Sequence, residues 1–86
     1  MLNFPNESRS YDATRRCVRF WGYDGALEVS FFIEENALYG IAPGTRHNQA
    51  ALLQSFDSNR ARILIAARKV YVGRPQGSYA LTSSDL

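Results

Sequence analysis

Few side chains in this sequence have the types and spacing that catalysis requires. Cys17 is the single cysteine and His47 the single histidine of the 86 residues. A nucleophilic thiol needs a neighbouring base, and the two arginines that precede Cys17 cannot serve as one. We therefore expect Cys17 to be a half-buried, small apolar residue beside Phe32. We expect His47 to be a solvated residue near the start of a long helix rather than an acid–base group.

The acidic residues and glycines give no stronger signal. No spacing requires Glu34, Glu35 or Asp57 to pair as catalytic carboxylates. The first two are typical of the start of a helix, and Asp57 of a helix surface. The six glycines are scattered and form no phosphate-binding loop. Metal sites need several ligands at characteristic spacings. The sequence therefore predicts a non-enzymatic protein with no catalytic residues, no cofactor and no metal site.

Two surfaces are candidates for binding a partner. The candidate interaction surface consists of Arg19, Trp21, Glu28 and Phe32. Tryptophan and arginine are favoured at protein-interaction hot spots, and aromatic sheet faces also stack unpaired bases. Alternatively, the N-terminal segment covers this surface, or Arg19 stacks on Trp21. A protein partner or self-association is the first hypothesis.

The candidate anion-contact surface follows the C-terminal half of the predicted long helix. It consists of Arg62, Arg68, Lys69 and Arg74, with Arg60 nearby. Such a cluster can attract an anionic partner, which makes weak nucleic-acid binding the alternative function. It is also typical of a solvated helix face whose cations lie near the negative end of the helix dipole.

A β-hairpin is expected to carry the first of these surfaces. Two β-rich runs flank Asp24-Gly25, the residues typical of a two-residue type I′ turn. That turn would place Tyr23 opposite Ala26 and Phe20 opposite Val29. Because side chains alternate across a strand, one face is predicted to be apolar and the other mixed. The apolar face collects Val18, Phe20, Leu27, Val29, Phe31 and Ile33.

The rest of the chain is divided by turn and capping signals. We expect a short edge strand at residues 2–4, a loop at 6–12 in which Tyr11 covers the core, and a short helix ending near Ala42. A long helix from Gln49 to about Val72 follows, with Asn48 as its N-cap or Thr45 as the alternative. It has a possible kink or break at 57–59 and an end at Gly73 and Pro75. A last strand at 78–82 and a frayed tail at 83–86 complete the chain.

This order of elements indicates an α+β fold. Three N-terminal strands and a C-terminal strand should form a small antiparallel sheet, with both helices on its apolar face. The length predicts a single domain over residues 1–86. The net charge of +2 is too small to imply a nucleic-acid partner. The single cysteine suits a reducing cytoplasm, and we see neither a signal peptide nor a membrane span.

Several short motifs occur in an order that resembles a known family. They are Asn3-Phe4-Pro5, Val18-Arg19-Phe20-Trp21-Gly22, Asp24-Gly25, Val29-Ser30-Phe31, Glu35-Asn36-Ala37-Leu38 and Phe56-Asp57-Ser58-Asn59-Arg60, followed by Ile63 and Ala66-Ala67. From about Leu2 to Leu81 the chain resembles small uncharacterised proteobacterial proteins, the domain of unknown function 1488. The resemblance implies a compact α+β domain of three strands, two or three helices and a final strand. It implies no activity and no functional residues.

Overall fold

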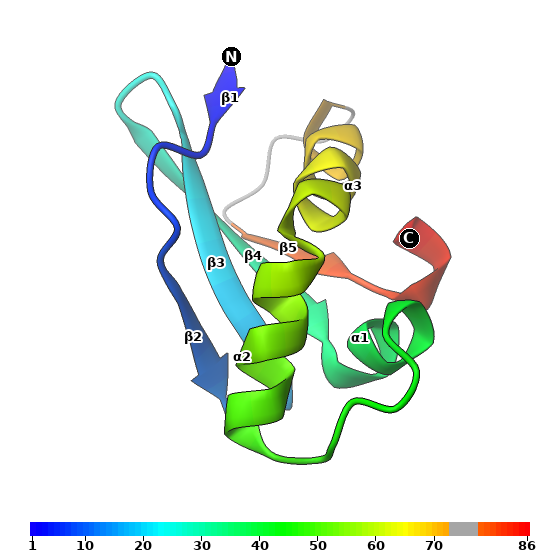
Figure 1. Cartoon of the computed structure of the whole chain (residues 1–86). Helices are drawn as coiled ribbons and strands as arrows, with labels where there is room; N and C mark the ends of the chain where they lie inside the picture. The colour runs from blue at the N-terminus through cyan, green and yellow to red at the C-terminus, as the bar shows by residue number, and fades with distance from the viewer. Residues whose placement is uncertain (73–77) are drawn as a thin grey trace.

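The predicted hairpin lies at the centre of a five-stranded sheet, with three helices packed on one face (Figure 1). Its strands are β3 (Cys17–Asp24) and β4 (Leu27–Glu34). The computed structural model describes residues 1–72 and 78–86 of the chain. The α+β class and the placement of the helices on the apolar face of the hairpin are confirmed.

The turn of the hairpin differs from the prediction by one position. Asp24 pairs with Leu27, so the loop residues are Gly25 and Ala26. Phe20 consequently faces Phe31 rather than Val29. Only the first loop residue, Gly25 at +61°, has a positive φ, which is the pattern of a type II′ turn rather than type I′. Each residue of β3 therefore pairs with a β4 residue two positions further along than predicted. Because side chains alternate faces with a period of two, the residues predicted to share a face still share it.

One residue of the predicted apolar face does not join the core. Leu27 is 61% exposed because it lies at the end of β4, beside the turn and beyond the helices.

The N-terminal segment runs along one edge of β3 as two short strands. β1 (Leu2–Asn3) pairs with the end of β3 and confirms the predicted edge strand. β2 (Arg9–Asp12) pairs with the start of β3, so the predicted loop at 6–12 is wrong over these residues. The free edge of β3 supplies hydrogen-bond partners that no local pattern in the segment reveals. Tyr11 does pack against the core, as expected.

The C-terminal strand makes the sheet mixed rather than antiparallel. β5 (Ser78–Leu81) lies beside β4 and is parallel to it. Parallel neighbours require a long crossover, and the helical region between β4 and β5 provides it. Within β5, Tyr79 and Leu81 are both buried, so the predicted shared face is confirmed.

In the described residues, three helices rather than two cover the sheet. α1 (Glu35–Ile41) follows β4 directly. α2 (Gln49–Ser58) begins where expected, because the Asn48 side chain accepts a hydrogen bond from the Ala51 amide at 2.8 Å. α3 (Arg60–Val72) follows after an interruption at Asn59, so the possible break is real.

Asn59 explains the break between α2 and α3. Its side-chain amide donates to the Ser55 carbonyl at 2.9 Å, and its own carbonyl accepts from the Ile63 amide at 3.0 Å. Asparagine favours helix ends because its side chain competes for backbone partners. The helix axis changes direction there (Figure 1). The end predicted at Gly73 and Pro75 lies outside the described residues.

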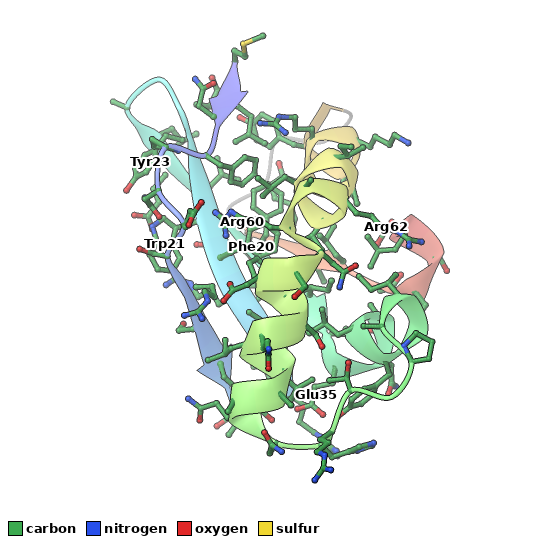
Figure 2. The ribbon with its side chains drawn as sticks, viewed as in Figure 1. Phe20, Trp21, Tyr23, Glu35, Arg60 and Arg62 are labelled. Atoms are coloured by element: carbon green, nitrogen blue, oxygen red, sulfur yellow. The ribbon has the colours of Figure 1, made fainter. Side chains whose placement is uncertain are left out.

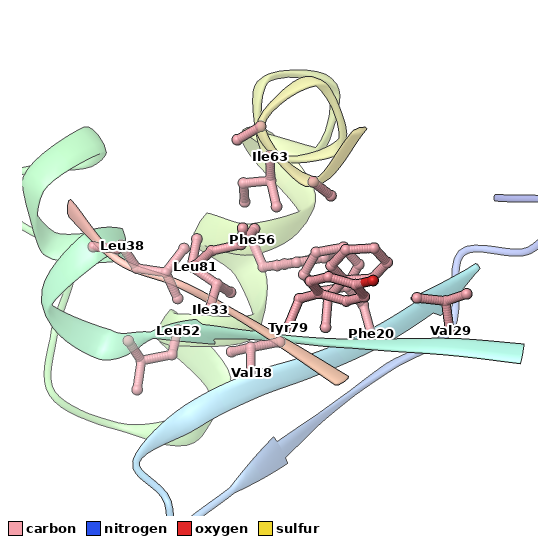
Figure 3. Close-up of a cluster of buried hydrophobic side chains, with 14 of the residues drawn as sticks. Val18, Phe20, Val29, Ile33, Leu38, Leu52, Phe56, Ile63, Tyr79 and Leu81 are labelled. Atoms are coloured by element: carbon pink, nitrogen blue, oxygen red, sulfur yellow. The ribbon is translucent and has the colours of Figure 1, made fainter. Parts of the chain in front are cut away.

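The core fills the space between the sheet and the helices (Figure 3). β3 and β4 contribute Val18, Phe20, Val29, Phe31 and Ile33; the helices contribute Ala37, Leu38, Leu52, Phe56, Ile63, Ala66 and Ala67; Leu2, Tyr79 and Leu81 complete it. At the C-terminus, where a frayed tail is predicted, Ser83–Asp85 instead form a 3₁₀ turn. Thr82 and Asp85 cap this turn reciprocally, which satisfies two backbone donors. In the part of the chain that the structure describes, no helix combines the length and hydrophobicity needed to cross a bilayer.

A hydrogen bond ties the last helix to the hairpin. The Tyr71 hydroxyl on α3 donates to Asp24 Oδ2 at 2.5 Å. This bond raises the pKa of Tyr71 to about 12, and it lowers the pKa of Asp24 below its usual value. The contact therefore favours a neutral phenol and an ionised carboxylate.

The Tyr71–Asp24 bond should make folding stability depend on alkaline pH. The folded-state pKa of Tyr71 exceeds its unfolded value of about 10. Its contribution is therefore fully present below pH 10 and is lost as the pH rises towards 12. The melting temperature of the natural protein should exceed that of Tyr71→Phe at pH 8, and the difference should shrink over this window. A difference that does not change with pH, or one that Asp24→Asn leaves intact, would contradict this assignment.

Candidate functional site

The face of the sheet opposite the helices carries the candidate interaction surface. The β3–β4 register places Arg19, Trp21 and Tyr23 on it from β3. In Figure 2, Trp21 and Tyr23 project from β3 away from Phe20, which points towards the helices. Glu28, Ser30 and Phe32 join them from β4. The open sheet face is defined here by Arg15, Arg19, Trp21, Tyr23, Glu28, Ser30 and Phe32.

Arg19 organises the centre of the open sheet face. Its guanidinium carbon lies 4.8 Å from the centroid of the Trp21 ring. Its Nη2 lies 3.1 Å from the Ser30 hydroxyl and 3.5 Å from Glu28 Oε1. The stacking of Arg19 on Trp21, one of the alternatives raised from the sequence, is therefore present. The Trp21 side chain nonetheless remains partly exposed.

A second arginine covers Phe32. The guanidinium carbon of Arg15, from the turn between β2 and β3, lies 3.9 Å from the centroid of this ring. The N-terminal strands lie beside β3 and pair with its edge, so they do not lie over the face. Two aromatic rings are thus covered by long cationic side chains rather than by an element of the fold. A partner would therefore have to displace side chains, and not a strand or helix of the described chain, to reach the two rings.

Cys17 is more deeply buried than expected. It is 2% exposed and pairs with Glu34, not with Phe32, because of the two-residue shift in register. Burial is the main cause that raises the pKa of its thiol. A protonated, enclosed thiol is a poor nucleophile.

His47 is exposed in the loop before α2, as predicted. Its ring stacks on Tyr39, with centroids 4.3 Å apart and planes 22° apart. His47 and Cys17 come from different parts of the fold, and the structure gives no contact between them. Among the described residues, no group of three or more potential metal ligands is found.

The acidic candidates have structural partners. Asp57 on α2 accepts two hydrogen bonds from Arg9 on β2, both at 2.8 Å. Glu35 is 7% exposed, accepts a hydrogen bond from the Tyr11 hydroxyl and lies 3.7 Å from Arg16 Nη2. The sequence places Glu35 at the start of a helix and does not predict this cluster. The only sign of this cluster in the sequence was the expected position of Tyr11 against the core. Local patterns give no further sign, because the partner of Glu35 comes from a distant part of the chain.

With this geometry established, the chain can be compared with known proteins. The family described as "Protein of unknown function (DUF1488)" matches residues 2–82. The chain belongs to this family. The resemblance inferred from the order of short motifs is therefore confirmed, and the family description assigns no activity. No curated protein shows a significant match to the chain.

A solved structure supports the fold of this DUF1488 chain. It is the crystal structure of a protein of unknown function from the same family, from Shewanella loihica PV-4. The sequences are 19% identical, and the match covers 93% of this chain and 90% of the other with a TM-score of 0.81. At this identity, the similarity establishes the shared fold alone.

The candidate anion-contact surface is divided in this DUF1488 domain. Arg62 and Lys69 line one shallow groove with Asp85. Arg68 instead lies over the Phe4 ring, 5.2 Å from its centroid, on another side of α3. Arg74 lies outside the described residues, and the Arg60 guanidinium donates to the Asn6 carbonyl at 2.8 Å. The helix thus presents two separated cationic positions, one of which lies beside a carboxylate.

Proposed function

We propose that this DUF1488 protein is a non-enzymatic interaction module that pairs with a second copy of itself through the open sheet face. The observation that carries the proposal is the composition of this face. It combines aromatic rings with arginines, the residue types enriched at interaction hot spots. These rings are covered only by side chains that can move.

The charges on the open sheet face favour a second copy over another occupant. Arg15 and Arg19 supply two positive charges, and Glu28 and the neighbouring Glu34 supply two negative ones. A twofold interface brings the same surface of both subunits together. A surface with equal numbers of positive and negative charges can then place the arginines of one subunit against the carboxylates of the other across the twofold axis. We place this dimer in the cytoplasm, in keeping with a buried, unpaired cysteine.

The oligomeric state tests the proposal. The natural protein should form a concentration-dependent dimer in sedimentation equilibrium. The double variant Trp21→Ser/Phe32→Ser should be monomeric, with an unchanged far-ultraviolet circular dichroism spectrum. The matched control is the double variant Leu27→Ser/Ile65→Ser. It removes two apolar side chains that are exposed but lie outside the open sheet face, and it should still dimerise.

Three outcomes would overturn this function. The natural protein could be monomeric at all accessible concentrations, or the control could dissociate as completely as the double variant. Unfolding of the double variant would show that Trp21 and Phe32 belong to the core.

Nucleic-acid binding is the alternative raised by the basic residues. Its discriminating experiment is a titration with short single- and double-stranded oligonucleotides, followed by the fluorescence of Trp21, the only tryptophan. Saturable binding that weakens with salt would support this alternative, because phosphate contacts release counterions. We expect no saturable change, since Glu28 lies beside Arg19 and would repel a phosphate.

A further inference from the structure

A cleft of about 370 Å³ lies where three connecting segments meet. The turn between β2 and β3 contributes Arg15 and Arg16, the start of α1 contributes Glu35, and the loop before α2 contributes His47. Small-molecule sites in proteins begin at about this volume. Of these four residues, only Arg15 belongs to the open sheet face, where it covers Phe32.

Arg16 is held in the cleft at a conformational cost. Its φ of +52° makes it the only non-glycine residue with a positive φ among the described residues. This left-handed conformation favours glycine, because a Cβ atom clashes with the neighbouring carbonyl. A non-glycine residue held in this region is a candidate for a functional role. A residue from another element holds the backbone of Arg16, since the Glu35 amide at the start of α1 donates a hydrogen bond to the Arg16 carbonyl at 3.2 Å.

The guanidinium of Arg16 retains donors for a ligand. Its Nη2 is 3.7 Å from Glu35 Oε1, which is an ion pair but too long for a hydrogen bond. The Arg16 side chain is 77% exposed. Glu35 already accepts a hydrogen bond from the Tyr11 hydroxyl. Within residues 1–72 and 78–86, we find no hydrogen bond from the Arg16 side chain.

The charges of the lining select the kind of anion. Arg15 and Arg16 are balanced by Glu34 and Glu35, with His47 counted as neutral. Such a site does not concentrate enough positive charge for a dianion. A planar monoanionic carboxylate suits it better, because a guanidinium presents two parallel N–H donors to the two carboxylate oxygens.

Part of the cleft lining is aromatic. Tyr39 and His47 stack with their ring centroids 4.3 Å apart, and both line the cleft. His47 is exposed, so its imidazole retains a free flat face. A ring that stacks on this face would continue the existing pair.

We propose that this cleft binds a small aromatic carboxylate. The carboxylate accepts hydrogen bonds from the guanidinium of Arg16, and the ring stacks on the imidazole of His47. The cleft adjoins the open sheet face and shares Arg15 with it, but Arg16 and His47, the two proposed ligand contacts, lie outside that face.

The test is a titration of the ¹⁵N-labelled full chain with sodium benzoate, followed by amide chemical shifts. We expect saturable changes at residues 15–16, 34–36 and 47, with a dissociation constant in the millimolar range typical of so small a ligand. Benzamide has the same shape without the charge and should bind at least about tenfold more weakly. Phenyl phosphate, a dianion, should also bind more weakly.

Two variants with the same change in net charge identify the contact. Arg16→Gly removes the guanidinium and relieves the positive φ, so it should keep or raise the melting temperature and abolish benzoate binding. Arg46→Gln is the control, since Arg46 adjoins His47 in sequence but does not line the cleft. It should bind like the natural protein. The single variant Trp21→Ser leaves the contact of Arg15 with Phe32 in place and should bind equally well, which separates this site from the dimer.

Several results would overturn the proposal. They are the absence of saturable shifts with benzoate, equal binding of benzamide, or tighter binding of phenyl phosphate. Retained binding by Arg16→Gly would contradict the role of the guanidinium. Marked destabilisation of that variant would show that Arg16 serves the fold instead.

Discussion

Replacing Phe20 with alanine is expected to lower the free energy of unfolding by ~3–5 kcal/mol. Phe20 is fully buried and lies between the two layers of the fold. Its ring centroid is 5.1 Å from that of Phe56 on α2, 5.3 Å from Phe31 and 6.0 Å from Phe4. The cavity left by Phe20→Ala would remove the contact of all three rings at once. Urea denaturation followed by far-ultraviolet circular dichroism measures the loss.

Trp21→Ala is the matched control for Phe20→Ala. It removes a still larger aromatic side chain from the next position, but from the opposite face of β3. We expect a loss of at most about 1 kcal/mol, because the ring is partly exposed and contacts mainly the Arg19 guanidinium. Equal losses for the two variants would mean that the open sheet face is part of the core, and would remove the basis of the proposed interface.

Gly22→Ala is expected to destabilise the protein by about 1–3 kcal/mol. A Cβ atom at this position would lie 2.7 Å from the Asn3 carbonyl oxygen and 2.9 Å from two atoms of the Phe4 ring. The backbone of β1 would have to move away from β3, which would disturb the packing of Leu2 and Phe4. Thermal denaturation should show a lower melting temperature.

Gly40→Ala provides the comparison for Gly22→Ala. Nothing lies within 4 Å of a Cβ atom built at Gly40, which is in α1. Alanine has the higher helix propensity and restricts the unfolded chain, so this variant should be more stable by about 0.5 kcal/mol. If both variants change stability in the same direction, the close approach of β1 to Gly22 does not explain the effect.

These expectations share one structural feature, the asymmetry of the sheet. β3 and β4 send one set of side chains into a tightly packed aromatic core. They send the other set to the opposite face of the sheet, where Arg15 lies over Phe32 and Arg19 lies over Trp21. The same alternation therefore separates residues needed for folding from residues available for association. The two kinds of variant should have separable effects, which makes the proposed function testable without loss of the fold.

The features that depend on local chemistry can be predicted from the amino-acid sequence alone. The alternation of side chains along β3 and β4 predicts the buried face, and an error of two residues in register leaves that face unchanged. Asn48 and Asn59 mark helix ends because their side chains bond to nearby backbone groups. The order of short motifs along the chain was enough to predict its membership of the DUF1488 family.

The pairing of distant segments, by contrast, depends on the packing of the whole fold. Whether residues 9–12 form a strand depends on the free edge of β3, and the direction of β5 depends on the path of the helices before it. The cleft proposed as a ligand site also depends on the tertiary structure. Arg16, Glu35 and His47 lie far apart in sequence and meet only after the sheet and helices have packed. Such contacts carry no periodicity, since each depends on the geometry of the whole fold.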